Sequence, residues 1–416
     1  MNYDSALKTN VPIPEPDLTP TVIVERAKAL RPMVRAEAAE AEKRGYYSQA
    51  LHDEFVKAGF YRMLQPRKFG GYEFDIPTFY KVMLEISTGD PGIGWCLCLG
   101  SGHALQVGSY YTEEAQGKIF GPEGHFISPL SATGTSPNCK AIPVKGGYRV
   151  SGKWRYCSGV PYSTHFMGLA KVPLDGGKTK TILVVVPRED FKMLDDWGSI
   201  LGFRASGSNS VVIEDAVIPE NFTTDLLFSD NIAGGSPGSR AHGNTMYGGV
   251  FLGFAPGELA CPNVGAARAS LEEFERIIKT TRPRYAPSML KYEHHDWQRI
   301  FGMALSMNQA AEAILMRAGE LYMEYARANV EGTRPFTLGD ALQLQGMYHQ
   351  AIRLSWESGV ETFRASSSTS AQDGEPMQRF FRDLATFKNN ATHQADFVSP
   401  RIAQTYFGLP LAEFDL

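Results

Sequence analysis

The strongest constraint on the fold is the order in which two residue patterns follow one another along the chain. Residues 20–120 are rich in good helix formers, and apolar residues such as Leu51 and Phe55 recur near helical spacing. The chain then changes to short β-branched or aromatic runs bounded by Gly, Pro and Asn, and residues 146–147 are predicted to form a hairpin turn. These patterns predict an N-terminal helical domain over 20–120 and a β-domain over 121–226.

A long segment rich in Gly, Ser and Pro separates the β-domain from a second helical region. Residues 227–262 are predicted to form a loop, and loops of this length are usually functional or mobile. Further on, apolar residues from Trp297 to Tyr325 recur in alternating steps of four and three, interrupted only by Asn308. The sequence therefore predicts an α+β protein whose last domain, residues 263–416, is a bundle of helices.

Composition excludes several classes of function. The 416 residues include 41 Lys and Arg and 45 Asp and Glu, with a net charge of −4 and no basic run, so nucleic acid and anionic membranes are not expected partners. No apolar run approaches the ~20 residues of a membrane span, and no secretory signal is visible. The five cysteines are scattered, which fits free thiols in a reducing cytoplasm, and Cys96 and Cys98 are not expected to bind metal.

One stretch of the β-domain has the composition of a surface for a planar cofactor. Residues 147–160 read GYRVSGKWRYCSGV and end on aromatic rings, a cysteine and the hydroxyl of Ser158, with no carboxylate or histidine. A hydrolase or a metal site would show those missing groups, whereas a ring and small hydroxyl groups can face a flat ring system. No GxGxxG follows a predicted strand, so no Rossmann dinucleotide site is expected.

Several motifs resemble the acyl-CoA dehydrogenase superfamily over about residues 20–416. HDEFVKAGFYRMLQPRKFGGYEFD and LGFRASGSNSVVIEDAVIPE are similar to the family's N-terminal segment and to the end of its β-domain. GWCLCLGSGHA, GGYRVSGKWRYCSGV and PMQRFFRDLATFKNNATHQ look more like its two-component flavin-dependent monooxygenases, the branch of p-hydroxyphenylacetate hydroxylases and dibenzothiophene monooxygenases. The resemblance implies the superfamily's α+β fold, with N-terminal helices, a middle β-barrel or sandwich and a C-terminal four-helix bundle.

The resemblance also implies roles for particular residues. Ser158 would lie near the flavin N5 atom, although a serine at a strand end commonly bonds local backbone instead. Trp154 is either a wall of the flavin site or part of the β-domain core. Trp95 and His103, eight residues apart on what would be one helix, would supply an aromatic wall and a substrate-facing histidine. His393, which points off the apolar stripe of the last helix, would lie beside the flavin C4a position.

Further residues are assigned to the cofactor in the same way. Hydroxyl groups for the pyrimidine edge of the flavin are expected at Ser131, Thr133 and Thr135. Arg282 and Tyr285 stand where the family has Arg-x-x-Phe, so they would reach the flavin of a neighbouring subunit. Gln309 stands where the family often has a flavin-edge glutamine, and its alternative is an ordinary amide on a helix surface.

Together these observations predict a reduced-flavin-dependent monooxygenase. Such an enzyme receives FMNH2 or FADH2 from a separate NAD(P)H-dependent flavin reductase and reacts with O2 to give a C4a-hydroperoxyflavin. It then hydroxylates a small phenolic, aromatic or heteroaromatic substrate, with His103 as the candidate base. A cytoplasmic homotetramer is expected, because the family packs through its C-terminal helices.

Three alternatives make different predictions. An acyl-CoA dehydrogenase would hold FAD tightly and use a carboxylate base, but the family's YEGT motif is absent and Asp373 and Glu375 lie in a polar stretch. An oxygenase acting on nitrogen or sulfur of a sugar or heterocycle would share the flavin chemistry and differ in its pocket. A non-catalytic assembly protein on the same scaffold would bind no flavin.

Overall fold

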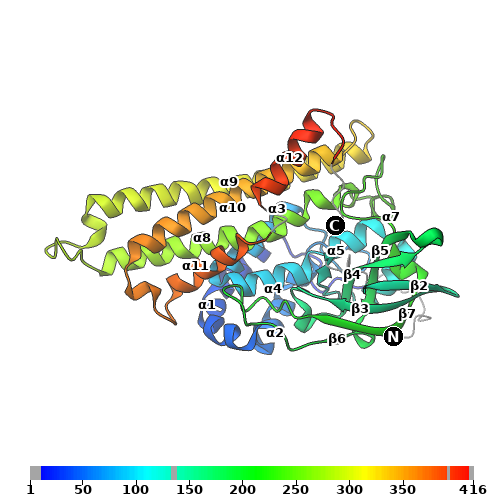
Figure 1. Ribbon diagram of the computed structural model, residues 1–416, viewed down its shortest axis with the longest axis horizontal. Coiled ribbons are helices and arrows are strands. Elements are labelled where there is room, and N and C mark those ends of the chain that lie inside the picture. Colours follow the sequence, from blue (N-terminus) through cyan, green and yellow to red (C-terminus); the bar gives the residue numbers. More distant parts are fainter. Residues whose placement is uncertain (1–10, 133–137, 391–393, 412–416) are drawn as a thin grey trace.

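The computed structural model describes residues 11–132, 138–390 and 394–411, which form three successive regions. The first region contains six α-helices: α1 (Pro20–Arg44), α2 (Gln49–Ala58), α3 (Ile76–Gly89), α4 (Pro91–Ser101), α5 (Ala104–Tyr110) and α6 (Glu113–Phe120). In Figure 1 α1 and α2 (blue) lie below the long C-terminal helices and to the left of the β-sheet. The predicted helical start of the chain is confirmed.

The second region is a single connected sheet. Its strands are β1 (Leu130–Ser131), β2 (Lys140–Val144), β3 (Gly147–Trp154), β4 (His165–Pro173), β5 (Thr179–Pro187), β6 (Lys192–Met193), β7 (Val211–Pro219) and β8 (Thr223–Thr224). They follow the order β6-β7-β3-β2-β4-β5-β8, and β1 pairs with β4. β2 and β3 form the predicted hairpin, with Val144 opposite Gly147.

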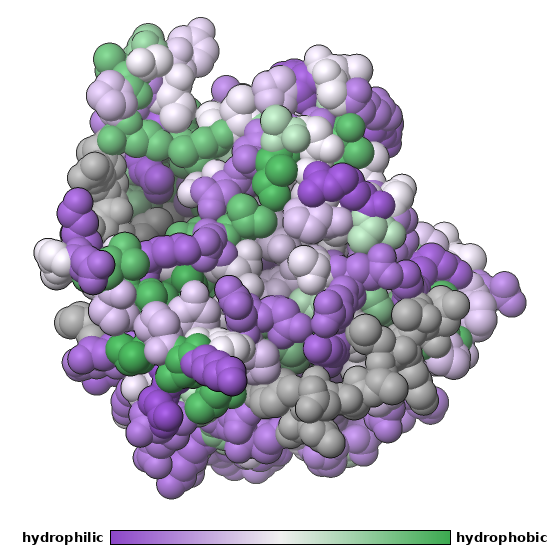
Figure 2. All heavy atoms as spheres, turned by 90° about the vertical axis from the view of Figure 1, so that its right-hand side faces the viewer, coloured by the Kyte–Doolittle hydropathy of each residue, from purple (hydrophilic) through white to green (hydrophobic). Residues whose placement is uncertain are grey.

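The sheet-bearing end of the molecule is predominantly polar on its surface. Figure 2 shows this end, where hydrophilic residues predominate and hydrophobic residues occur in small separate groups. Ile142 of β2 and Val217 of β7 are partly exposed, at 39% and 49%. β4 is buried from His165 to Ala170 and β5 from Ile182 to Pro187, which explains their β-branched and aliphatic runs.

The third region is helical: α7 (Pro237–His242), α8 (Ala255–Thr280), α9 (His295–Val330), α10 (Leu338–Ser366), α11 (Pro376–Phe387) and α12 (Ala395–Tyr406). The structure differs from the predicted 227–262 loop, because this range contains α7 and the first two turns of α8. Pro256 lies in the first turn of α8, where proline is tolerated. Within the described residues, no helix is both long and apolar enough to cross a membrane.

The predicted helical stripes form the core of the bundle. Val264, Leu271 and Phe274 of α8 are buried, as are Ala304 and Leu315 of α9. The one polar residue in the α9 stripe is accommodated by hydrogen bonds. The side-chain nitrogen of Asn308 donates to the Ala304 carbonyl at 2.9 Å and to Ser358 Oγ of α10 at 2.7 Å.

Close contacts join α3 to the start of α8 and to α10. The hydroxyl groups of Tyr80 and Tyr348 lie 2.9 Å apart, and both tyrosines are fully buried. Gly257 is required between them, because a Cβ atom at this position would lie 2.0 Å from the Tyr80 hydroxyl oxygen. The first turn of α8 is therefore fixed against the N-terminal helices.

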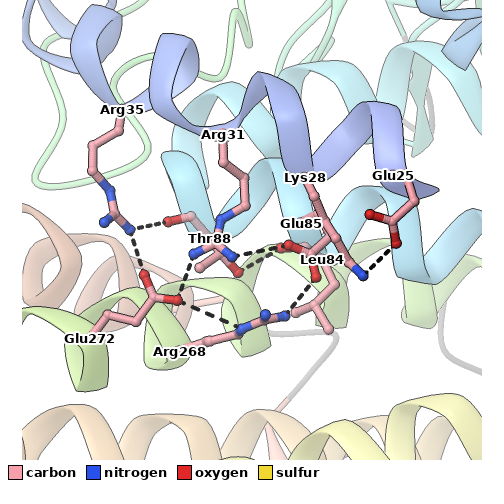
Figure 3. Close-up of polar contacts among 9 residues, drawn as sticks. All are labelled: Glu25, Lys28, Arg31, Arg35, Leu84, Glu85, Thr88, Arg268 and Glu272. Carbon is pink, nitrogen blue, oxygen red and sulfur yellow. Dashed lines mark hydrogen bonds and ion pairs between the residues drawn. The ribbon is translucent and has the colours of Figure 1, made fainter. Parts of the chain in front are cut away.

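A charged network fastens α8 to α1 and α3 three to four turns further along α8 (Figure 3). The buried carboxylate of Glu85 accepts hydrogen bonds from Arg31 at 3.1 Å and from Arg268 at 3.0 Å. Glu272 accepts from Arg31 at 2.5 Å and from Arg35 at 3.0 Å. Because these five side chains come from three helices, the network sets the position of α8 relative to the first region.

Candidate active site

The candidate site lies where α4 meets the turn that follows β3. Asp90 caps α4 by accepting a hydrogen bond from the Ile93 N–H at 3.0 Å. After β3, Gly159 has a φ of 88°, and a Cβ atom there would lie 2.7 Å from the Cys96 carbonyl oxygen. Only glycine lets this turn pack directly on α4, and it places Ser158 beside Trp95.

Trp95 and Ser158, which are 63 residues apart in the sequence, are joined by a hydrogen bond. The indole Nε1–H of Trp95 donates to Ser158 Oγ at 2.9 Å. Ser158 Oγ lies 2.7 Å from Ser208 Oγ, which lies 2.6 Å from Ser206 Oγ. Each hydroxyl can donate or accept a hydrogen bond. The three linked hydroxyls can therefore bond a ring nitrogen that accepts when the ring is oxidised and donates when the ring is reduced.

The sequence prediction missed Ser206 and Ser208. Their signal is the local sequence RASGSNS, in which serines alternate around Gly207 with a φ of 56°. This positive φ turns the loop, and the two serine side chains meet on one side of it. Hydroxyls at this spacing and a half-buried indole ring fit a flavin, whose ring needs a flat wall and small polar groups at one edge.

Two phenylalanines hold the indole ring of Trp95. The Phe203 ring centroid lies 4.8 Å from it and that of Phe387 lies 5.6 Å from it. Phe203 has a φ of 51°, which is unusual for a residue with a side chain. Asp383 of α11 stabilises this conformation, because its carboxylate accepts a hydrogen bond from the Phe203 N–H at 2.5 Å.

Asp383 belongs to a largely buried cluster of five charged residues. The cluster contains Glu42 of α1, Asp90 at the N-terminal cap of α4, and Arg379, Asp383 and Arg382 of α11. Arg382 Nη2 lies 2.9 Å from Glu42 Oε1, and Arg379 Nη1 lies 3.9 Å from Asp90 Oδ2. Burial raises the pKa of Asp90 to about 6, against the attraction of Arg379, and raises the pKa of Asp383 well above its usual range.

His103 lies in a different environment from Trp95. The prediction assumed one continuous helix, but α4 ends at Ser101 and His103 precedes α5. His103 is 3% exposed, and its Nδ1 lies 2.7 Å from the Ser128 carbonyl oxygen. A carbonyl only accepts, so Nδ1 carries the proton and Nε2 presents a lone pair. Burial lowers the pKa of His103 to about 4.

Glu258, in the first turn of α8, was also missed by the sequence prediction. Its Oε2 lies 3.8 Å from His103 Nε2, and the residue is 1% exposed. Burial raises its pKa well above the usual range, which favours the neutral form of the carboxyl group. The available signal was one acidic residue in the otherwise uncharged stretch FLGFAPGELACPNVG.

The other predicted residues of the β-domain have local partners. Trp154 is fully buried and its Nε1–H donates to the Leu169 carbonyl at 2.8 Å, which agrees with the core alternative. Ser131 is buried on β1, and its hydroxyl donates to the Arg155 carbonyl at 2.9 Å. Thr133, Thr135 and His393 lie outside the described residues, so their assigned roles remain predictions.

Three predicted residues lie on the helical bundle, away from this site. Arg282 and Tyr285 belong to the turn between α8 and α9, which Figure 1 shows at the opposite end of the bundle from the sheet. Tyr285 is 68% exposed, and its hydroxyl donates to Asp296 at 3.2 Å. Gln309 is exposed on α9, beside a groove of about 220 Å³ that Arg268 and Phe301 also line. Within one chain, these residues do not meet Trp95 and Ser158.

Two models of known protein domains match the chain. Residues 25–123 match the acyl-CoA dehydrogenase N-terminal domain, and residues 258–395 match the acyl-CoA dehydrogenase C-terminal domain. The chain belongs to the acyl-CoA dehydrogenase family. The three regions described above are those of the acyl-CoA dehydrogenase fold, as the resemblance implied.

Curated relatives cover almost the whole chain. A pigment production hydroxylase of Rhodococcus sp. (strain ATCC 21145) is 27% identical over 95% of this chain and 99% of its own. The flavin-dependent monooxygenase oxygenase subunit HsaA of Rhodococcus jostii is 26% identical over 94% and 99%. An indole-3-acetate monooxygenase of Pseudomonas putida is 29% identical over 90% of each chain.

Solved structures show the same fold. The HsaA monooxygenase of M. tuberculosis superposes with a TM-score of 0.84 at 19% identity, covering 96% of this chain and 100% of that one. XiaF from Streptomyces sp., in complex with FADH2 and glycerol, superposes with a TM-score of 0.83 at 21% identity, covering 95% and 98%. Both superpositions cover at least 95% of this chain.

Proposed function

We propose that this protein is the oxygenase component of a two-component flavin-dependent monooxygenase that hydroxylates a small aromatic substrate. The observation that carries the proposal is the hydrogen-bonded series Trp95–Ser158–Ser208. The names of relatives that align over nearly the whole chain support it, because they include a flavin-dependent oxygenase subunit and an FADH2-dependent resorcinol hydroxylase oxygenase component.

The residues of this chain would do the binding and proton transfer. Reduced FMN or FAD supplies the electrons for the reaction with O2 when it is bound. Trp95 would stack along the ring system, and Ser158 would bond its central edge. His103 Nε2 would accept a proton from the substrate, because Ser128 holds the other nitrogen protonated. His393 would act near the reacting edge of the flavin.

The acyl-CoA dehydrogenase reaction is not favoured by the carboxyl groups that the structure describes. Asp373 is exposed and accepts a hydrogen bond from Gln378 at 2.9 Å, on the polar stretch before α11. Burial raises the pKa of Glu258 well above its usual range and so favours the neutral carboxyl group, which is a poor proton acceptor. Asp373 is exposed on a polar stretch and Glu258 favours its neutral form, so neither fits an enclosed carboxylate base for an acyl thioester.

The proposal extends to partners and location. A separate NAD(P)H-dependent reductase would supply the reduced flavin, because no dinucleotide motif was found in the sequence. A cytoplasmic homotetramer is proposed, in which Arg282 and Tyr285 of one subunit approach the flavin of another. The exposed position of both residues at the end of the bundle supports this arrangement.

Labelled oxygen tests the proposed function. The purified protein is mixed with reduced FMN, or reduced FAD, a panel of phenols and heteroaromatics, and ¹⁸O₂. The expected product carries one ¹⁸O atom, and the reaction without protein gives none. Flavin reoxidation without labelled product, together with reduction of protein-bound FAD by an acyl-CoA, would establish the dehydrogenase reaction instead.

A further inference from the structure

A cluster of tyrosine and histidine side chains packs against the loop that carries the two serines of the candidate site. Cys96 follows Trp95 on α4, and a Cβ atom on Gly207 would lie 3.1 Å from its Sγ atom. Burial raises the pKa of the Cys96 thiol, and a hydrogen bond with the Tyr47 side chain opposes this rise. The Gly207 N–H also donates to the Gly45 carbonyl at 2.8 Å. Tyr47 is therefore joined to the site through Cys96 and through the backbone.

Two tyrosines and a histidine form a hydrogen-bonded series that begins at Tyr47. The hydroxyl oxygens of Tyr47 and Tyr61 lie 2.7 Å apart, and the Tyr61 oxygen lies 2.9 Å from His52 Nδ1. All three residues are buried. Burial, together with the nearby His125, lowers the pKa of His52 to about 4, so its ring is neutral at pH 7 and one of its nitrogens accepts. The series therefore ends in a base.

The same residues stack on Tyr162, whose ring leads toward the surface. The ring centroids of His52 and Tyr162 lie 4.1 Å apart and those of Tyr47 and Tyr162 lie 5.0 Å apart, with interplanar angles of 7° and 21°. The Tyr46 ring meets Tyr162 edge-on at 5.9 Å, and both residues are half-buried. The rings form a path from the buried hydroxyl groups to the edge of the protein.

Packing alone does not require polar rings at this place. The neighbouring Phe55 ring lies 5.2 Å from Tyr47 and 5.8 Å from Phe60, so hydrocarbon rings fill the same core. A buried hydroxyl must be paired, which makes each tyrosine here a constraint on its neighbours. Tyrosine can lose an electron, and the loss is easier when a hydrogen-bonded base takes the hydroxyl proton, because an oxidised phenol is a strong acid. Tyr61 has such a base in His52.

We propose that Tyr47, Tyr61 and His52 form a proton-coupled electron relay that discharges oxidants produced at the flavin site. The inference rests on the proposed function, because reduced flavin that reacts with O2 without a substrate releases hydrogen peroxide. Peroxide that takes one electron from reduced flavin gives hydroxide and a hydroxyl radical, which is the oxidant in question. Trp95 and the serine hydroxyls lie nearest to that reaction, and the relay protects them.

In the relay step, Tyr61 gives one electron to the oxidant and its hydroxyl proton to His52 Nδ1. The O–H bond of Tyr61 breaks and an N–H bond forms on His52. The products are a neutral tyrosyl radical, an imidazolium ion and hydroxide. A thiol in solution then returns one electron through Tyr46 and Tyr162, and His52 returns the proton to the Tyr61 oxygen.

Light-driven oxidation of the full-length protein tests the relay. Oxidised FMN is mixed with excess protein, illuminated and frozen, and radicals are recorded by electron paramagnetic resonance. Photoexcited FMN accepts one electron, so the wild-type protein should show a tyrosyl radical that Tyr61→Phe abolishes. His52→Phe keeps a ring against Tyr162 but removes the proton acceptor, and it should slow radical formation roughly 10²-fold, as expected for a lost acid–base group.

The chain offers a matched control in a second pair of buried tyrosines. The hydroxyl groups of Tyr80 and Tyr348 lie 2.9 Å apart and donate to the carbonyls of Phe254 and Gly253. Tyr80→Phe should leave the radical signal unchanged, because a carbonyl does not take up the proton. In the wild-type protein, D2O should slow radical formation, which covers the case in which Tyr61→Phe fails to fold. A wild-type signal in Tyr61→Phe, or equal rates in H2O and D2O, overturns the relay.

A second oxidant separates the relay from the proposed function. Photoexcited ruthenium trisbipyridine with persulfate oxidises the Tyr46 end without flavin. A Tyr61 radical with the ruthenium complex but not with FMN, and no ¹⁸O-labelled product, would leave the relay in place and refute the monooxygenase function. The same two radical results with labelled product would disconnect Tyr61 from the site and overturn the proposal.

A functional readout completes the test. During turnover with reduced FMN and O2 but no aromatic substrate, Tyr61→Phe should be inactivated several-fold sooner than the wild-type protein or Tyr80→Phe. Equal lifetimes of the three proteins would overturn the protective role.

Discussion

Arg379→Met is expected to destabilise the protein because it leaves a buried carboxyl group without its opposing charge. Arg379 is 8% exposed, and its Nη1 lies 3.9 Å from Oδ2 of Asp90, which is 1% exposed. Methionine preserves much of the apolar contact of the arginine stem, so the change removes mainly the charge. Breaking one partner of a buried ion pair typically costs about 3–5 kcal/mol, and this is the expected loss in the free energy of unfolding at pH 8.

The loss should be smaller at pH 5 than at pH 8. Burial already raises the pKa of Asp90 to about 6, and Arg379 opposes this rise. Without Arg379 the pKa rises further, so the folded state binds a proton more readily than the unfolded state over a wider range. Stability then falls as pH increases through this range, and at pH 5 the protonated Asp90 needs no counter-charge.

Urea titration followed by circular dichroism at both pH values measures the effect. The control is Arg353→Met, which removes a pair with Glu357 that is about half exposed, and its expected cost is about 0.3–0.5 kcal/mol with little dependence on pH. A loss below about 1 kcal/mol at pH 8 for Arg379→Met, or an equal loss at the two pH values, would refute the argument that Arg379 compensates Asp90.

Three other predictions concern the site. Trp154→Phe should lower the free energy of unfolding by about 1–3 kcal/mol, because the hydrogen bond to Leu169 is lost, and should leave the yield of product per reduced flavin unchanged. A lower flavin affinity at unchanged stability would identify Trp154 as a cofactor wall. Ser158→Ala should leave the Trp95 N–H without its acceptor and lower the product yield several-fold in chromatographic assays, whereas a wild-type yield would make Ser158 purely structural. In a pH profile, kcat/KM should fall with decreasing pH only near pH 4, because the neutral ring of His103 is the base and burial lowers its pKa to about 4. A fall near pH 6.5 that His103→Gln abolishes would contradict this.

Much of the fold was predictable because it depends on local periodicity. The apolar stripe of α11 (Phe380, Leu384 and Phe387) was recognised from helical spacing, and all three residues are buried. The same reasoning cannot find Arg379 and Asp383 on that helix. Charged side chains are expected to face solvent, and these two are buried only because Asp90, Glu42 and the Phe203 turn pack against them.

The parts of the site that were missed depend on contacts between distant segments. The start of α8 was predicted as loop because its glycines and prolines are typical of turns, so Glu258 was not considered. Gly257 and Gly102 are there because Tyr80 and Glu258 approach them, which periodicity does not reveal. Ser158 was assigned to the flavin N5 atom only through its resemblance to a family, and that role stays a prediction. Its contact with Trp95 was not predicted, because it spans 63 residues.

The position of α11 late in the chain has a consequence for how the protein is made. A ribosome synthesises Trp95, Ser158 and the Phe203 turn long before Asp383, which holds that turn in its strained conformation. Until α11 emerges, Glu42 and Asp90 also lack both arginines. We expect unfinished chains to remain unable to enclose a flavin, so the reaction with oxygen begins only in molecules whose synthesis has passed α11.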